Sequence, residues 1–131
     1  MDRSAAIFAI AFLLSIPGVA NSQVAPDAAA VEWEGKKVCE VLFEDTQIRV
    51  LRCEIPPGGV HVRHSHPARV TYTLNDGRGS TTDAKGTREY TDHAGTFSTA
   101  VAPAVDWHEV TNIGSSPLKY VLIDLKYKPQ K

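Results

Sequence analysis

Three of the five histidines stand at a spacing that suits metal binding. His64 and His66 are separated by one residue, and on a β-strand such side chains point to the same face, about 6.6 Å apart. His108 follows 42 residues after His66 in a second strand-like segment. Imidazole nitrogens bind zinc, copper, iron and nickel, whereas magnesium and calcium prefer oxygen. The spacing predicts a site for a divalent transition metal (Fe, Zn, Ni, Mn or Cu), provided that the fold brings the two segments together.

The other histidines do not fit this pattern. His61 lies an odd number of residues from His64, so strand alternation places it on the opposite face, at the surface. A bulge caused by residues 58–59 would change that assignment. His93 stands in a turn before Gly95 and is expected to be solvated. Trp107 alternates with His108 and therefore points away from the proposed site, toward a core layer or a subunit contact.

The segments that must position these histidines indicate an all-β protein. From residue 37 onward, short stretches rich in Val, Ile, Thr, Tyr and Phe are separated by clusters of Gly, Pro, Asn and Asp. No long helical periodicity interrupts them, which is typical of an antiparallel sandwich or barrel. The sequence predicts one barrel domain over residues 37–128, preceded over residues 23–36 by a loosely held N-terminal arm or one short helical turn.

The N-terminus has the features of a secretory signal. An apolar run over residues 5–20 follows Arg3 and ends at Pro17 and Gly18, with small residues before a cleavage site after Ser22. Cleavage of residues 1–22 would leave 109 residues in the periplasm or outside the cell, with no membrane attachment. The alternative is an uncleaved anchor or a buried helix, although the run is short for a membrane span.

Export bears on the two cysteines, because oxidising compartments allow disulfides to persist. If residues 44–47 form a turn centred on Thr46, Cys39 pairs with Cys53, and a cross-strand disulfide there is worth about 3 kcal/mol. The same register places two apolar sets on one face: Cys39, Val41 and Phe43, and Leu51, Cys53 and Ile55. The alternative is two buried free thiols, because a one-residue slip in the turn separates the sulfur atoms.

Composition and motifs exclude several classes of function. The chain has 14 Lys and Arg against 15 Asp and Glu, a net charge of −1, which argues against a nucleic-acid-binding surface. No glycine-rich phosphate loop, G-x-S-x-G motif or C-x2-C metal motif occurs in the sequence.

Two motifs, over residues 58–77 and 95–112, resemble those of the cupin superfamily, in particular small exported single-domain members. The first motif, G-x5-H-x-H with a later Gly, is matched by Gly58, His64, His66 and Gly77. The second motif, G-x5-P-x-G-x2-H-x3-N, is matched by Gly95, Pro103, His108 and Asn112. The resemblance covers residues 38–127. It implies an antiparallel jelly-roll β-barrel, a metal held by His64, His66 and His108, and pairing into homodimers through edge strands.

The sequence departs from the family pattern at three places. Seven residues separate Gly95 from Pro103 where the family has five, and Val105 replaces a Gly. The family's metal-binding Glu is missing: its position falls on Val70 or Thr71, or on Arg69 when the alignment follows residues 72–74. No Asp or Glu occurs between Glu54 and Asp76.

The missing carboxylate has a chemical consequence. Three neutral imidazoles leave a bound metal with its full positive charge, so the site should attract an anionic ligand or hydroxide. If Arg69 points inward, its guanidinium adds a fork suited to a carboxylate. Tyr72 is a second candidate for substrate binding, as a hydrogen-bond donor in the barrel interior, with core packing as its alternative role.

Two hypotheses for function remain open at this stage. The first is a metal-dependent enzyme that acts on a small anionic substrate by dioxygenase, isomerase or lyase chemistry, with no catalytic residue assigned. The second is a non-catalytic barrel that binds a small ligand or a metal through a degenerate metal site. The fold alone cannot decide between them, because function depends on the site.

Overall fold

A computed structural model describes residues 24–98 and 100–127, which form ten strands and no helix. The signal segment predicted for residues 1–22 lies outside the described residues. In chain order the strands are β1 (Glu32–Trp33), β2 (Lys36–Lys37), β3 (Cys39–Glu44), β4 (Ile48–Ile55), β5 (Val60–His66), β6 (Arg69–Thr73), β7 (Gly77–Asp83), β8 (Gly86–Asp92), β9 (Val105–Asn112) and β10 (Leu118–Leu125).

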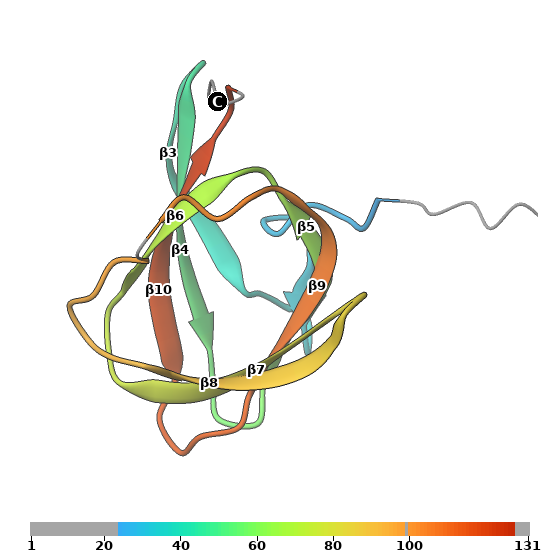
Figure 1. The fold of residues 1–131 in the computed structure, drawn as a ribbon, viewed down its shortest axis with the longest axis vertical. Helices are drawn as coiled ribbons and strands as arrows, with labels where there is room; N and C mark the ends of the chain where they lie inside the picture. Colours follow the sequence, from blue (N-terminus) through green and yellow to red (C-terminus); the bar gives the residue numbers. More distant parts are fainter. Residues whose placement is uncertain (1–23, 99, 128–131) are drawn as a thin grey trace, which may run out of the picture.

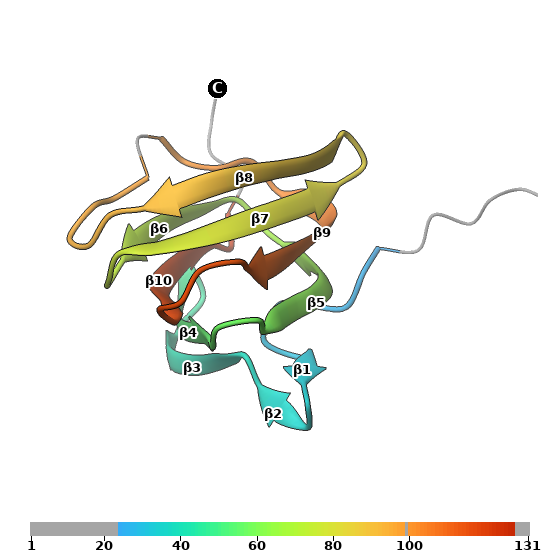
Figure 2. The ribbon, with the colours of Figure 1, turned by 90° about the horizontal axis from the view of Figure 1, so that it is seen from below.

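Two four-stranded sheets form the wall of a barrel (Figures 1 and 2). One sheet has the order β3-β4-β10-β6 and the other β5-β9-β7-β8, and every strand pairing within them is antiparallel. The predicted antiparallel β-barrel is therefore confirmed. No described residue belongs to a helix of the length and apolarity that a membrane crossing requires.

Apolar side chains fill one half of the barrel interior. On β4, Leu51, Cys53 and Ile55 are fully buried and alternate with exposed residues, as expected for a strand with one face toward the core. Leu118 and Leu122 on β10 complete this apolar core. Burying a leucine or isoleucine side chain contributes roughly 1.5–3 kcal/mol, so this half of the barrel is a main source of stability.

The hairpin of β3 and β4 has the predicted pairing at its base and a different arrangement at its tip. Cys39 lies opposite Cys53, and a disulfide joins them, as predicted. The register then shifts between Val41 and Phe43, where a β-bulge adds one residue to β3. The prediction that both residues share one apolar face with Leu51 is correct for Val41, which lies opposite Leu51, and wrong for Phe43, which lies opposite Val50. Both side chains are exposed, by 44% and 51%.

The pairing of β5 with β9 brings the two histidine segments together. His64 lies directly opposite His108 in this ladder. From His61 to His64, β5 advances three residues while β9 advances two, so a bulge places both side chains on the inner face. The prediction that His61 lies at the surface is therefore wrong: its side chain is fully buried.

The N-terminal arm is held firmly against β5. Asp27 forms a parallel bridge with Ser65, and the Ser65 amide donates to the carbonyl of Pro26 at 2.8 Å. Ala28 is fully buried and lies in a hydrogen-bonded turn. The arm is therefore part of the barrel wall, and the prediction of a loosely held segment is wrong, although the alternative of a single turn is close to the structure.

Asn112 fixes the end of β9 relative to its neighbours. Its side-chain amide donates to the carbonyls of Ile55 and Ser116, at 2.8 and 2.9 Å, and its Oδ1 accepts from the amide of Gly114 at 2.9 Å. The side chain is buried. The Asn112 side chain thus forms hydrogen bonds with three backbone groups, which stabilises the loop after β9.

Candidate metal centre and its cavity

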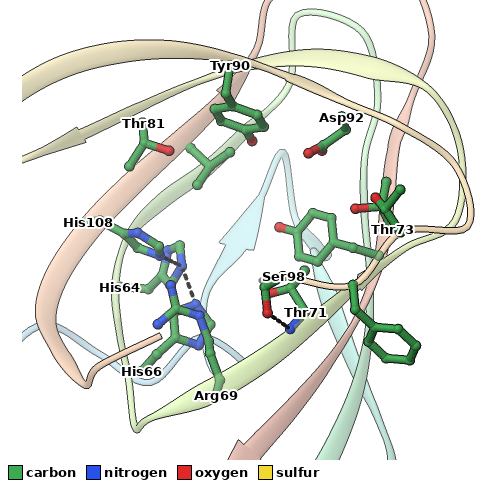
Figure 3. Close-up of a pocket in the computed structure, with 14 residues that line it drawn as sticks. His64, His66, Arg69, Thr71, Thr73, Thr81, Tyr90, Asp92, Ser98 and His108 are labelled. Atoms are coloured by element: carbon green, nitrogen blue, oxygen red, sulfur yellow. Dashed lines mark hydrogen bonds between the residues drawn. The ribbon is translucent and has the colours of Figure 1, made fainter. Parts of the chain in front are cut away.

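Three histidine side chains converge in the polar half of the barrel (Figure 3). The Nε2 atom of His64 lies 2.9 Å from the Nε2 atoms of both His66 and His108, and all three side chains are buried. Strand β5 supplies two of them and β9 supplies the third. The cluster that the H-x-H spacing predicted is therefore present.

The imidazoles of this cluster are neutral. Burial lowers the pKa of His64 to about 2 and the pKa of His108 to about 3, and it also lowers the pKa of His66. His64 Nδ1 donates to the carbonyl of Val62 at 2.7 Å, so its Nε2 presents a lone pair to the cluster. Neutral imidazoles with exposed lone pairs are the form that binds metal ions.

The donor set fits a divalent transition metal. Three ligand atoms, one from each of His64, His66 and His108, lie within 4.8 Å of one another. Nitrogens bound about 2.0–2.1 Å from one tetrahedral ion would be roughly 3.3 Å apart, close to the observed 2.9 Å. Three protein ligands also leave a coordination position for a small molecule, as catalytic rather than structural metal sites do.

The histidine cluster faces a cavity of about 320 Å³. From β6, Arg69, Thr71 and Thr73 line the cavity, whereas Tyr72 does not and instead packs against Phe97, with ring centroids 4.6 Å apart. Arg69 and Tyr72 are three residues apart, so in a regular strand they cannot share a face. The cavity therefore contains the predicted Arg69, and the structure places Tyr72 outside it.

Arg69 on β6 carries a half-buried guanidinium, and Asp124 lies opposite it in the ladder with β10. Burial lowers the pKa of its guanidinium, yet an arginine remains charged at neutral pH. Its contact with the protein is a long one, 3.5 Å from Nη1 to the carbonyl of Pro103, and it forms no ion pair with any described residue. An anionic ligand would satisfy this guanidinium.

The far side of the cavity carries hydroxyl and carboxyl groups that the sequence analysis did not identify. Tyr90 and Asp92 line it from β8 (Figure 3), and Tyr120 lines it from β10. Burial raises the pKa of all three groups, and the nearby Asp92 carboxylate raises the pKa of both tyrosines further. A Cβ atom at Gly79 would overlap the Tyr90 hydroxyl, so only a glycine at this position leaves room for the Tyr90 ring. Alternation along residues 88–92 was the signal that could have revealed Tyr90 and Asp92.

His61 connects the cluster to the disulfide. Its ring stacks on that of His64 with centroids 3.5 Å apart, and its Nε2 donates to the carbonyl of Ala28 at 3.0 Å. Cys39 Sγ lies 3.9 Å from the same nitrogen. The fourth buried histidine therefore supports the His64 ring from behind, whereas His93 is exposed, as predicted.

The chain belongs to the cupin family: the cupin domain model matches residues 51–124. Of the three positions considered for the family's missing Glu, Arg69 and Thr71 line the cavity and Val70 does not.

Solved structures agree with this assignment at the level of fold. A cupin domain from Bordetella pertussis has a TM-score of 0.63 and 21% identity, covering 69% of this chain and 93% of that one. A double-stranded β-helix protein from Klebsiella pneumoniae has a TM-score of 0.57, 20% identity and coverages of 75% and 84%. An RmlC-like cupin protein from Methanocaldococcus jannaschii has a TM-score of 0.54, 18% identity and coverages of 72% and 89%. A search of curated proteins found no match.

Proposed function

We propose that this protein is an exported cupin that holds a divalent transition metal through His64, His66 and His108 and binds a small anionic ligand beside it. The observation that carries this proposal is the convergence of three neutral imidazoles in one cavity with a half-buried guanidinium that forms no salt bridge with a described residue. A divalent metal and Arg69 would place two cations on one side of the cavity. A carboxylate would meet both.

Different residues of the cavity would bind different parts of the ligand. Arg69 would orient the ligand's carboxylate by paired hydrogen bonds, while Tyr90, Tyr120 and Asp92 would contact its polar groups at the other end. A metal bound by the histidines supplies Lewis acidity, which polarises an oxygen atom of the ligand. Dioxygenase, isomerase and lyase reactions of small carboxylates are the chemistries that we infer for such a site.

The disulfide supports the export of this protein, which is part of the proposal. Cys39 and Cys53 are joined, and disulfides persist in the periplasm and outside cells. This pairing supports the predicted cleavage after Ser22, which a mass measurement of protein secreted by its host would check.

A homodimer is a further element of the proposal. The edge strand β3 extends beyond the barrel in Figure 1 and carries three consecutive exposed apolar residues, Val41, Leu42 and Phe43. An exposed apolar edge strand offers both backbone hydrogen bonds and surface for association. Light scattering of wild type and Phe43→Lys tests this, with a dimer expected for wild type and a monomer for the variant.

The alternative is a barrel that binds ligand or metal without catalysis. The missing Glu favours it, because a ligand set without a carboxylate holds a divalent ion less tightly. Metal-loaded protein that binds acetate in calorimetry, yet consumes no oxygen and converts no member of a panel of small carboxylates followed by NMR, would support this alternative.

Elemental analysis of untagged protein tests the metal site. We expect about one equivalent of metal in wild type and little in His64→Ala or His108→Ala. His93→Ala is the matched control, since its side chain is exposed in a turn and metal should be retained. Less than about a tenth of an equivalent in wild type, under conditions that do not strip metal, would contradict the proposal. The identity of the metal would narrow the chemistry: iron points to oxygen chemistry, and zinc or nickel to Lewis-acid chemistry.

A further inference from the structure

A buried carboxylate lies behind the histidine cluster. Asp124 Oδ1 on β10 is 3.8 Å from His66 Nδ1, and the side chains are exposed by only 1% and 3%. Among the described residues neither of these two atoms has a hydrogen-bond partner. Two buried polar atoms that face each other without other partners are best satisfied by a proton on the nitrogen that points at the carboxylate.

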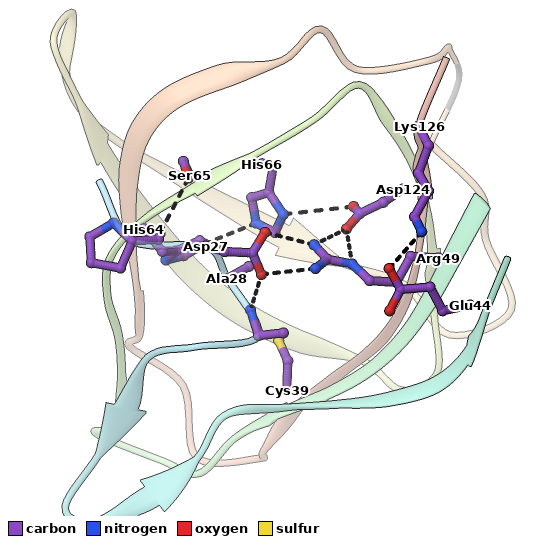
Figure 4. Close-up of polar contacts among 12 residues, drawn as sticks. Asp27, Ala28, Cys39, Glu44, Arg49, His64, Ser65, His66, Asp124 and Lys126 are labelled. Carbon is purple, nitrogen blue, oxygen red and sulfur yellow. Dashed lines mark hydrogen bonds and ion pairs between the residues drawn. The ribbon is translucent and has the colours of Figure 1, made fainter. Parts of the chain in front are cut away.

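The carboxylate is held in place by Arg49 (Figure 4). Arg49 Nε and Nη2 donate to Asp124 Oδ2 at 3.1 and 2.7 Å, while Nη1 and Nη2 donate to the two oxygens of Asp27 at 3.0 and 2.8 Å. One guanidinium therefore binds two carboxylates, and the three groups together carry one negative charge. Asp124 keeps its other oxygen, Oδ1, free to face His66.

This arrangement sets the direction of the His66 lone pair. With its proton on Nδ1 toward Asp124, His66 presents an unprotonated Nε2 to the cluster. His64 does the same, because its Nδ1 carries the proton that it donates to the Val62 carbonyl. Two lone pairs 2.9 Å apart repel each other unless a cation lies between them. The polar groups behind the cluster thus prepare it for a positive ion.

We propose that Asp124 is the positioning residue of the metal centre: it orients His66 and supplies, from behind the ligands, the negative charge that the missing family Glu would have contributed directly. This inference rests on the proposed metal site. A carboxylate behind a metal-binding histidine fixes the ring and raises its basicity.

The N-terminal arm takes part through Asp27. Its Oδ1 accepts from the amide of Ala29 at 2.9 Å, and the adjacent Ala28 amide donates to the carbonyl of Ser65 at 3.1 Å. Ser65 lies between His64 and His66 on β5. The arm therefore holds both Arg49 and β5 in place. Asp27→Asn should weaken metal binding less than a change at Asp124.

The first experiment measures zinc affinity by competition with a chelator. Asp124→Asn keeps the shape and removes the charge, and we expect about 10- to 100-fold weaker binding. Glu40→Gln is the matched control, because this carboxylate also pairs with an arginine, Arg52 at 2.6 Å, but is exposed. The melting temperature of each metal-free variant separates affinity from folding. Zinc affinity of Asp124→Asn within twofold of wild type would overturn the inference and leave the metal site standing.

The second experiment needs no variant. Nitrogen-15 NMR of the histidine rings in metal-free wild type should show His66 protonated on Nδ1, and a proton on Nε2 would overturn the inference even if Asp124→Asn does not fold. Wild type that binds no zinc would overturn the proposed function and the metal role of Asp124 together. The NMR result would then show only whether Asp124 orients His66, so the two failures are distinguishable.

Discussion

The barrel interior has two halves that bury different chemistry. One half contains the disulfide and the side chains of Leu51, Ile55 and Leu118, all with negligible exposure. The other half buries the histidine cluster, beside the half-buried Arg69. In the apolar half, every side chain removed from water stabilises the fold. In the polar half, burial of the polar groups destabilises the fold unless a ligand pairs with them.

His61 marks the boundary between the halves. It contacts Cys39 of the disulfide at 3.9 Å and stacks on His64 of the cluster. The two halves therefore differ in role. The apolar half stabilises the fold, and this stability offsets the cost of the unpaired polar groups that would bind a metal and an anion in the polar half.

The largest effect is expected in the apolar half. Leu51→Ala should lower the free energy of unfolding by about 2–5 kcal/mol, because it leaves a cavity in a fully buried site. Denaturant titration measures this, and Leu74→Ala, at a residue that is 41% exposed, should change it by less than about 0.5 kcal/mol. Zinc stoichiometry should stay unchanged in folded Leu51→Ala; its loss would show that the halves are not independent.

Removal of the disulfide is expected to have the next largest effect. A double variant, Cys39→Ala with Cys53→Ala, should lose about 3 kcal/mol, because a cross-link over 14 residues restricts the unfolded chain. Denaturant titration with and without reductant measures the loss. Reductant should destabilise wild type and leave the double variant unchanged; an unchanged wild type would contradict the prediction.

Acid should destabilise the polar half. Burial lowers the pKa of His61 from its ordinary 6.5 to about 4, so between these values the unfolded chain takes up a proton that the folded protein excludes. The free energy of unfolding of metal-free protein should therefore fall as the pH is lowered from about 6.5 to 4. The share of His61 is on the order of 3 kcal/mol.

The variant His61→Phe isolates this share. It keeps a planar ring but cannot be protonated, so its free energy of unfolding should fall less steeply over the same pH range. His93→Phe, at an exposed position, is the control. Equal slopes for wild type and His61→Phe would contradict the assignment of a neutral buried imidazole.

The smallest effect concerns Arg69. Arg69→Glu replaces a cation beside the cluster with a carboxylate, so zinc should bind about tenfold more tightly, while acetate binding to the zinc-loaded protein should be lost. Arg63→Glu makes the same charge change at an exposed residue that stacks on Trp107, and should alter neither affinity. Unchanged zinc affinity in Arg69→Glu would mean that residue 69 does not occupy the family's Glu position.

Patterns within a strand or a hairpin were predictable from the sequence. Alternation identified the buried face of β4, and the pairing of Cys39 with Cys53 is as predicted. The pairs nearest the turn, such as Glu44 with Arg49, are centred between residues 46 and 47, and the bulge on β3 restores the predicted register at the base. The H-x-H spacing identified two ligand candidates because it depends on the pleat of a single strand.

The errors arose where an extra residue changed the pleat. One bulge reversed the expected facing of His61 on β5, and another moved Phe43 on β3 from the face of Leu51 to that of Val50. A bulge depends on the partner strand, so alternation along one strand does not reveal it. Tyr72 is a different case, because alternation from Arg69 already placed it on the other face.

By itself the sequence determined the strand-rich fold, the three histidines and the absence of an acid from residues 55–75. Only the tertiary structure decided that Asp124, 58 residues beyond His66, faces its Nδ1, and that Arg49 joins this carboxylate to Asp27. Sequence distance carries little information about such contacts, because β10 lies in the sheet opposite β5 and the packing of the two sheets brings Asp124 to His66. The negative charge missing from the motif is thus supplied from outside it.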